Sequence, residues 1–121
     1  MSQEQEPEVF FDDLALSDDV LDALYDMRFE TCTPVQAKCI PPILENRDVL
    51  GVAQTGTGKT AAFMLPILNH LWKVRRPRHI GHPRALVLSP TRELAAQTAE
   101  NVKKYSKYCQ LPLCPISMPS P

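Results

Sequence analysis

The sequence feature that most constrains the fold is an octapeptide, Ala53-Gln-Thr-Gly-Thr-Gly-Lys-Thr60, that lies between two apolar segments. The segment before it, Asp48 to Ala53, is apolar without alternation, which predicts a strand covered on both faces, as in a parallel sheet. After it, from about Lys59 to Trp72, apolar residues recur at helical spacing. A strand, a glycine-containing loop and a helix in this order are the context that a phosphate-binding loop requires.

Each part of the octapeptide suits the binding of a nucleotide phosphate. Gly56 and Gly58 leave room for successive backbone N–H groups to approach phosphate oxygens, and the following helix directs its positive end toward the anion. Lys59 is expected to reach the β- and γ-phosphates, and Thr60 to offer its hydroxyl to Mg²⁺. An ordinary glycine turn that caps a helix is the alternative interpretation of the same residues.

Two helices are predicted before this loop. Acids in the first turn and apolar residues on one face predict a short helix at about residues 18–27. Thr33 followed by Pro34 is a typical start of a second helix, with the threonine as N-cap. Pro41 and Pro42 then predict a kink or an early stop, because proline cannot donate a hydrogen bond inside a helix.

A second strand and a further helix are predicted after the loop. Residues Ala85 to Ser89 form another apolar run, and Pro90-Thr91 opens a helix. The resulting order of helix, helix, strand, helix, strand, helix predicts an α/β fold with a parallel sheet and right-handed crossovers. The buried face of the last helix is expected to hold Leu94, Thr98, Val102 and Tyr105.

Charge is unevenly distributed along the chain. Residues 1–30 contain ten acids and one base, whereas residues 31–121 contain four acids and twelve bases. A basic body is typical of proteins that bind polyanions. The sequence contains no run of the ~20 apolar residues that a membrane span needs, no secretory signal, and no zinc-ligand spacing of its cysteines. We therefore expect a cytoplasmic protein with reduced thiols and no membrane association.

Three blocks of the sequence together resemble the DEAD-box family of ATP-dependent RNA helicases. Phe29 to Gln36, with Phe11 eighteen residues before Phe29, is similar to the family's Q motif and its upstream aromatic residue. Ala53 to Thr60 resembles the family's own form of the phosphate-binding loop, and Pro90 to Ala95 resembles its motif Ia. The resemblance covers roughly residues 10–108.

The resemblance implies a nucleotide site with ATP and Mg²⁺ as its ligands. In the family the Q-motif glutamine reads the adenine edge, a role that falls on Gln36, whose carboxamide has an acceptor and two donors. The family's Q-motif aromatic residue packs on the base, which falls on Phe29, with Phe11 behind it; plain core packing is the alternative for both. The implied nucleotide-binding residues are Phe11, Phe29, Gln36, Ala53, Gln54, Thr55, Gly56, Thr57, Gly58, Lys59 and Thr60, of which Thr60 also holds Mg²⁺.

The resemblance also implies RNA as a partner, bound through its backbone without sequence preference. Motif Ia contacts the RNA backbone in the family, and Arg92 here can pair with a phosphate while Thr91 and the first N–H groups of the helix hold one. The alternative is a helix cap followed by a solvated arginine. The basic segment 73–84 is interpreted as a solvated connector, with an RNA patch as its alternative. The implied RNA-binding residues are Pro90, Thr91, Arg92 and Glu93.

The sequence departs from the family pattern in several places. Arg28 stands where the family usually has glycine before the Q-motif aromatic residue. The Asp-Glu-Ala-Asp motif, which supplies the Mg²⁺ ligand and the group that positions water, is absent, and so is the second RecA-like domain. The proline-rich segment 111–121 does not match the strand that the family places there. We interpret the chain as a truncated or frame-shifted product that folds poorly alone, because its sheet edges stay unpaired.

These observations lead to one leading hypothesis and two alternatives. Residues 1–9 are expected to form a disordered acidic leader, residues 10–110 a partial RecA-like P-loop NTPase domain with an incomplete parallel sheet flanked by helices, and residues 111–121 a non-matching tail. The chain is expected to bind ATP, Mg²⁺ and RNA backbone. Duplex unwinding with ATP hydrolysis is expected only of the whole helicase, of which this chain would be a fragment. The alternatives are a fragment of another P-loop NTPase that acts on DNA, and an inactive fragment without a ligand.

Overall fold

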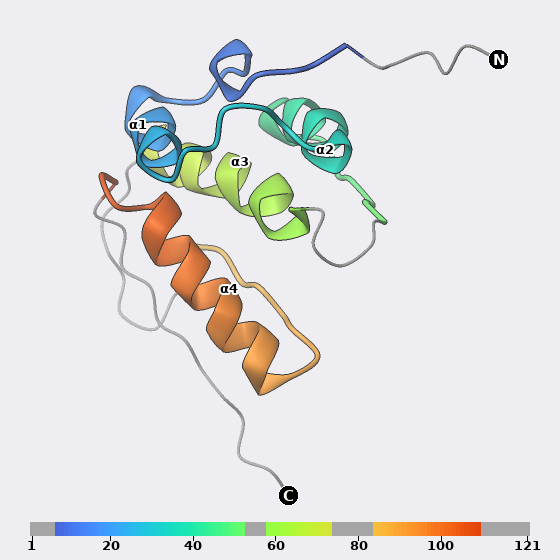
Figure 1. Cartoon of the computed structure of the whole chain (residues 1–121). Helices are drawn as coiled ribbons and strands as arrows, with labels where there is room; N and C mark the ends of the chain where they lie inside the picture. Colours follow the sequence, from blue (N-terminus) through green and yellow to red (C-terminus); the bar gives the residue numbers. More distant parts are fainter. Residues whose placement is uncertain (1–6, 53–57, 74–83, 110–121) are drawn as a thin grey trace, which may run out of the picture.

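The computed structural model describes residues 7–52, 58–73 and 84–109. Within these ranges the chain forms one short 3₁₀ helix and four α-helices, shown in Figure 1. Their bounds are Phe11–Asp13 for η1, Asp18–Asp26 for α1, Pro34–Leu44 for α2, Lys59–Lys73 for α3 and Arg92–Tyr105 for α4. None of these helices is both long and apolar enough to span a membrane.

Helix α3 lies at the centre of the packing, and α1, α2 and α4 all contact it (Figure 1). Leu65 of α3 is fully buried, as are Ile40 of α2 and Val20 of α1. Burying a side chain of this size stabilises the fold by about 1.5–3 kcal/mol before the entropy cost of folding is subtracted. The core consists of Phe11, Leu16, Val20, Leu24, Ile40, Ala61, Met64, Leu65, Leu68, Val102, Tyr105 and Cys109.

Threonine caps begin two of the helices, as the sequence predicts. Thr33 precedes α2, and its Oγ1 accepts a hydrogen bond from the Gln36 N–H at 3.4 Å. Thr91 precedes α4, and its Oγ1 accepts from the Leu94 N–H at 3.2 Å. Each bond satisfies one of the donors that the first turn of a helix leaves without an intrahelical partner. The short first helix is also confirmed, at Asp18–Asp26.

Helix α2 continues through its two internal prolines to Leu44, so an early stop at Pro41 and Pro42, one of the two outcomes expected there, is wrong. The two residues remove two N–H donors from the helix, which is costly in isolation. However, α2 packs extensively against α3, and Ile40, directly before the prolines, is fully buried. Tertiary packing of this kind supplies most of the stability of a helix in a protein, and here it outweighs the missing bonds.

The two segments expected to be strands do not form strands among the described residues. Residues 48–52 and 85–89 have no ladder partner there, and Leu50 and Leu88 are 93% and 84% exposed. In Figure 1 the first segment follows the end of α2, the second leads into the start of α4, and the two lie apart, so they do not pair with each other. A central strand needs hydrogen-bonding neighbours and helices on both faces, and an apolar run without them has nothing to pack against.

The buried face predicted for α4 is only partly formed. Val102 and Tyr105 are buried as expected, and Thr98 is partly buried. Leu94, in the first turn, is 43% exposed, so its prediction as a buried residue is wrong. Figure 1 shows the reason, because the C-terminal end of α4 packs against the other helices while its N-terminal end extends away from them.

A polar contact ties the end of α1 to the residues after α4. The Asp26 carboxylate accepts hydrogen bonds from the Tyr108 hydroxyl and from Lys107 Nζ, the latter at 3.0 Å. These bonds, that from Tyr108 first, lower the pKa of Asp26, and the carboxylate raises the pKa of Lys107 and of Tyr108. Since all three residues are exposed, water and salt weaken the contact, which orients the helix ends more than it stabilises them.

Two helices end in the same way, with one residue in the left-handed conformation. After α1, Arg28 has a φ of 60°, and its N–H donates to the Tyr25 carbonyl at 2.9 Å. The next N–H, that of Phe29, donates to the Leu24 carbonyl at 2.9 Å. After α2, Asn46 has a φ of 64° and begins an equivalent pair of bonds. This Schellman arrangement favours glycine at the left-handed position, so Arg28, which replaces the glycine usual in the resembled family, is strained.

Replacing Arg28 by glycine is expected to raise the free energy of unfolding by about 1 kcal/mol, because the left-handed strain exceeds the entropy that glycine adds to the unfolded chain. Thermal unfolding followed by circular dichroism measures the effect, with an expected increase in Tm of roughly 4–8 °C. Asn46→Gly is the matched control, since asparagine tolerates the same conformation and its replacement is expected to change Tm less. An unchanged or lower Tm for Arg28→Gly would show that the position is not strained.

Candidate functional site

The side chain of Gln36 joins the first turn of α2 to the residue that precedes α3. Gln36 is 4% exposed. Its Oε1 accepts a hydrogen bond from the Thr33 N–H at 2.9 Å, which completes a reciprocal capping box with the bond from the Gln36 N–H to Thr33 Oγ1. Its Nε2 donates to the Gly58 carbonyl at 3.2 Å. One carboxamide therefore fixes two helix N-termini relative to each other.

Gly58 is the residue of the octapeptide that this arrangement depends on. Its φ of 82° lies in the left-handed region, and a Cβ added there would lie 2.2 Å from Gln36 Nε2. Its carbonyl also accepts a hydrogen bond from the Ala62 N–H at 3.1 Å, the first bond of α3. Glycine is thus required here for backbone conformation and for space, in addition to the close approach of phosphate expected from the sequence.

Lys59 and Thr60 form the first turn of α3, directly after Gly58. The Lys59 side chain is exposed, and Thr60 is partly buried. The N–H groups of this first turn have no intrahelical acceptors and point out of the helix end, where a phosphate oxygen could accept them. The other octapeptide residues of the predicted site, Ala53, Gln54, Thr55, Gly56 and Thr57, lie outside the described residues.

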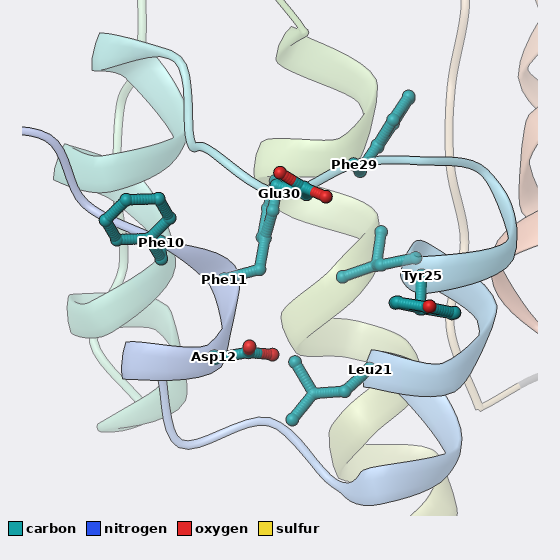
Figure 2. Close-up of a pocket in the computed structure, with 8 residues that line it drawn as sticks. Phe10, Phe11, Asp12, Leu21, Tyr25, Phe29 and Glu30 are labelled. Carbon is teal, nitrogen blue, oxygen red and sulfur yellow. The ribbon is translucent and has the colours of Figure 1, made fainter.

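The two predicted aromatic residues contact each other. The ring centroids of Phe11 and Phe29 lie 6.4 Å apart with an angle of 20° between the rings, and Phe29 also lies 6.4 Å from Tyr105 of α4. Phe11 is buried in the core, whereas Phe29 is partly exposed. Both line a pocket of about 190 Å³ between η1 and α1, shown in Figure 2. Gln36 is not among the residues that line this pocket.

The residues predicted to contact RNA lie at the free end of α4. Thr91 is the N-cap, as the alternative interpretation of this segment required, and Pro90, Arg92 and Glu93 are exposed beside it. Figure 1 shows this end of α4 apart from the N-terminal end of α3, so the two predicted phosphate-facing helix ends are not brought together within the described residues.

Two contacts of the site were not predicted from the sequence. The pairing of Phe29 with Tyr105 joins residues far apart in the chain, and periodicity only indicated that Tyr105 is buried. Burial also raises the pKa of the Tyr105 hydroxyl. The capping box was detectable, because a threonine followed three residues later by glutamine is its sequence signature. From the sequence, Gln36 is expected only to read the base.

The chain is similar in sequence to DEAD/DEAH box helicases. The pattern of the DEAD/DEAH box helicase family matches residues 33–119. The ATP-dependent RNA helicase DeaD of Klebsiella pneumoniae is 52% identical over 101 residues, which cover 84% of this chain and 15% of that protein. The ATP-dependent RNA helicase SrmB of Escherichia coli is 47% identical over 107 residues, which cover 88% of this chain and 24% of that protein.

Two solved structures show the same relationship. The RNA helicase Prp28 of Chaetomium thermophilum, bound to ADP, matches with a TM-score of 0.77 and 34% identity over 91% of this chain and 27% of that chain. A DEAD box protein of Methanococcus jannaschii matches with a TM-score of 0.68 and 35% identity over 82% of this chain and 26% of that chain. The described helices therefore fit a P-loop NTPase fold, and the chain spans about a quarter or less of the curated relatives named above.

Replacing Gly58 by alanine is expected to lower the free energy of unfolding by about 1–2 kcal/mol from the left-handed backbone alone. The clash of the new Cβ with Gln36 Nε2 lowers it further. Combining this change with Gln36→Ala removes the clash, so the two losses should be less than additive by about 1 kcal/mol in urea unfolding. Gly51→Ala with Gln36→Ala is the control pair and should be additive, because an added Cβ at Gly51 would meet Cys39 and Val35 instead. Additive losses for Gly58→Ala would contradict the contact.

Proposed function

The chain belongs to the DEAD/DEAH box helicase family, and on that premise we propose that it is the nucleotide-binding portion of an ATP-dependent RNA helicase. The observation that carries this proposal is the hydrogen bond from Gln36 Nε2 to the Gly58 carbonyl, since it joins the residue expected to read the base to the loop expected to hold the phosphates. The 121-residue chain is proposed to bind ATP, Mg²⁺ and RNA backbone, and the whole helicase to hydrolyse ATP while opening RNA duplexes. A cytoplasmic location is part of this proposal.

The phosphate end of the proposed site is the start of α3. Gly58 fits this role for two reasons. It adopts the left-handed conformation that other residues avoid, and it has no Cβ to block a phosphate at the start of the helix. Lys59 is exposed directly beside the free N–H groups of the helix, where it can reach the β- and γ-phosphates. The Thr60 hydroxyl is the hard oxygen donor that Mg²⁺ prefers. Ala53 to Thr57 are proposed to complete the cradle with their backbone N–H groups.

The base end of the proposed site is Gln36. Its two side-chain bonds use one lone pair of Oε1 and one hydrogen of Nε2, so one lone pair and one N–H remain. These suit the N6 amino group and N7 of adenine, whereas the O6 oxygen of guanine would face the acceptor. Because Gln36 is almost fully buried, only the edge of a base can reach it. Phe29 is proposed to pack on the base face, with Phe11 behind it.

The parallel sheet of the fold is also proposed to form in the whole helicase. The apolar residues of segments 48–52 and 85–88 are largely exposed in the described structure, which is unfavourable for residues of this type. In the whole helicase the two segments would form strands that lie between other strands of the sheet. Their apolar side chains would then be buried, and the octapeptide would lie at the end of a buried strand. The match to one solved relative over 91% of this chain supports this proposal.

Two substitutions test the nucleotide site, with fluorescent ATP and GTP titrated in the presence of Mg²⁺. Lys59→Ala is expected to weaken ATP binding by about tenfold or more, because it removes a charge-assisted contact to phosphate. Gln36→Ala is expected to reduce the preference for ATP over GTP. Lys73→Ala, at the other end of α3, and Gln97→Ala, on the exposed part of α4, are the matched controls. Equal affinities of the unaltered chain for ATP and GTP would contradict the role of Gln36.

One substitution tests the RNA contact. Arg92→Ala is expected to weaken binding of single-stranded RNA equally for different sequences and to reduce the slope of log K against log salt by about 0.7, the contribution of one phosphate contact. Thr91, Pro90 and Glu93 would position this arginine at the helix start. Arg47→Ala, which removes an exposed arginine at the end of α2, is the control and should leave the slope unchanged. A sequence-dependent loss would contradict a backbone contact.

A further inference from the structure

Tyr105, the last residue of α4, belongs to the core and not to the solvent-facing side of the helix. It is 4% exposed. In the core its ring meets that of Phe29, with 6.4 Å between the ring centroids and an angle of 52° between the rings. The sequence predicts only that Tyr105 is buried, whereas the structure shows that it is buried against a residue of the candidate site.

Phe29 depends on its neighbours for the orientation of its ring. Its backbone is fixed by the turn after α1, where its N–H donates to the Leu24 carbonyl at 2.9 Å. The backbone alone does not fix the side chain, because different staggered rotamers direct the ring to different places. Phe11 contacts the ring in a stacked arrangement, and Tyr105 contacts it at a tilt. Since Phe29 is still partly exposed, part of its surface stays open to a ligand.

The end of α4 that carries Tyr105 is anchored to the turn that carries Phe29. Directly after α4, Lys107 and Tyr108 donate hydrogen bonds to the Asp26 carboxylate. Asp26 is the last residue of α1 and lies just before the turn that leads to Phe29. These exposed bonds add little stability, but they orient the helix end relative to the turn. Tyr105 therefore stands on a fixed support and not on a frayed terminus.

The ring of Tyr105, and not its hydroxyl, makes the contact. The hydroxyl forms no hydrogen bond to another described residue. Burial raises its pKa, so it stays neutral at physiological pH. A phenylalanine at this position would therefore keep the contact with Phe29. A side chain without a ring would fill part of the same space, but it could not present an aromatic surface to Phe29.

We propose that Tyr105 is a positioning residue for the nucleotide base. Together with Phe11, its ring holds Phe29 in the orientation that packs on the base, and Tyr105 acts only through Phe29. This inference rests on the proposed function, in which Phe29 contacts the base. A ring that is fixed before the ligand arrives loses no rotamer freedom on binding, which increases the affinity for the base. The phosphate contact of Lys59, at the start of α3, does not involve this ring.

The test compares ATP with inorganic tripolyphosphate, which carries three phosphates but no base. Both are titrated with Mg²⁺ into the 121-residue chain by calorimetry, and the ratio of their dissociation constants measures what the nucleoside adds. Tyr105→Met, which fills much of the volume without a ring, is expected to reduce this ratio about fivefold, since stacking of a base on an aromatic ring contributes a factor of this size or more. Tyr105→Phe is expected to leave the ratio unchanged. An unfolded fraction weakens both ligands equally, so it cancels in the ratio.

Val102→Ala is the matched control. Val102 is a buried core residue one turn earlier on the same helix, and it takes no part in the ring contact. Its truncation is expected to lower the stability of the chain without changing the ratio. Tyr105→Leu repeats the measurement with a second side chain that lacks a ring, so the result does not depend on the folding of one variant.

Two results would overturn the proposal. One is an equal weakening of ATP and tripolyphosphate by the ring-free variants, which would assign Tyr105 a purely structural role. The other is a reduction of the ratio by Val102→Ala as large as that by Tyr105→Met. A failure of the proposed function looks different, because the unaltered chain would then bind ATP no more tightly than tripolyphosphate. In that case the base contact itself is wrong, and the role of Tyr105 is wrong with it.

Discussion

The hydrogen bond between Gln36 and Gly58 joins two helix N-termini across 22 residues of sequence, and the arrangement of the site depends on it. The first turn of α2 is closed by Thr33 and Gln36, and the same carboxamide then holds the carbonyl that begins α3. Gly58 can occupy this place only because it has no Cβ. Helices α2 and α3 pack together along their lengths, so this junction also sets where Lys59 and Thr60 stand relative to the segment from Phe29 to Gln36.

Features that depend on neighbouring residues in the chain could be predicted from the sequence, and features that depend on distant ones could not. Thr33 and Thr91 cap helices at the predicted places, because a cap is formed with residues three positions away. The strands at 48–53 and 85–89 and the burial of Leu94 were predicted from the pattern of apolar residues alone. Burial requires a partner surface, and the described residues supply none for these segments.

In the candidate site, too, local features could be predicted from the sequence and long-range contacts could not. The start of a helix at about Lys59 was predicted from one motif and is confirmed, and Gly58 directly before it has a φ of 82°. The tether from Gln36 to Gly58 and the contact of Phe29 with Tyr105 link separate motifs, which spacing in a sequence cannot specify. The strain at Arg28 could not be predicted from the sequence either, because only the backbone geometry of the turn shows why glycine is preferred there.

The short segment from Phe29 to Gln36 connects the aromatic contacts at its start to the helix junction at its end. Phe29 lies near Phe11 and Tyr105, and Gln36 donates a hydrogen bond to the Gly58 carbonyl, directly before Lys59. The proposed roles of these two residues, packing on the base and reading its edge, therefore fall on side chains that also hold the fold together. Truncating Phe29 would disturb its contacts with Phe11 and Tyr105 as well as the proposed base contact, whereas Lys59 is exposed, so a change of its charge leaves this packing intact. A change at Lys59 is therefore the change that separates nucleotide binding from stability.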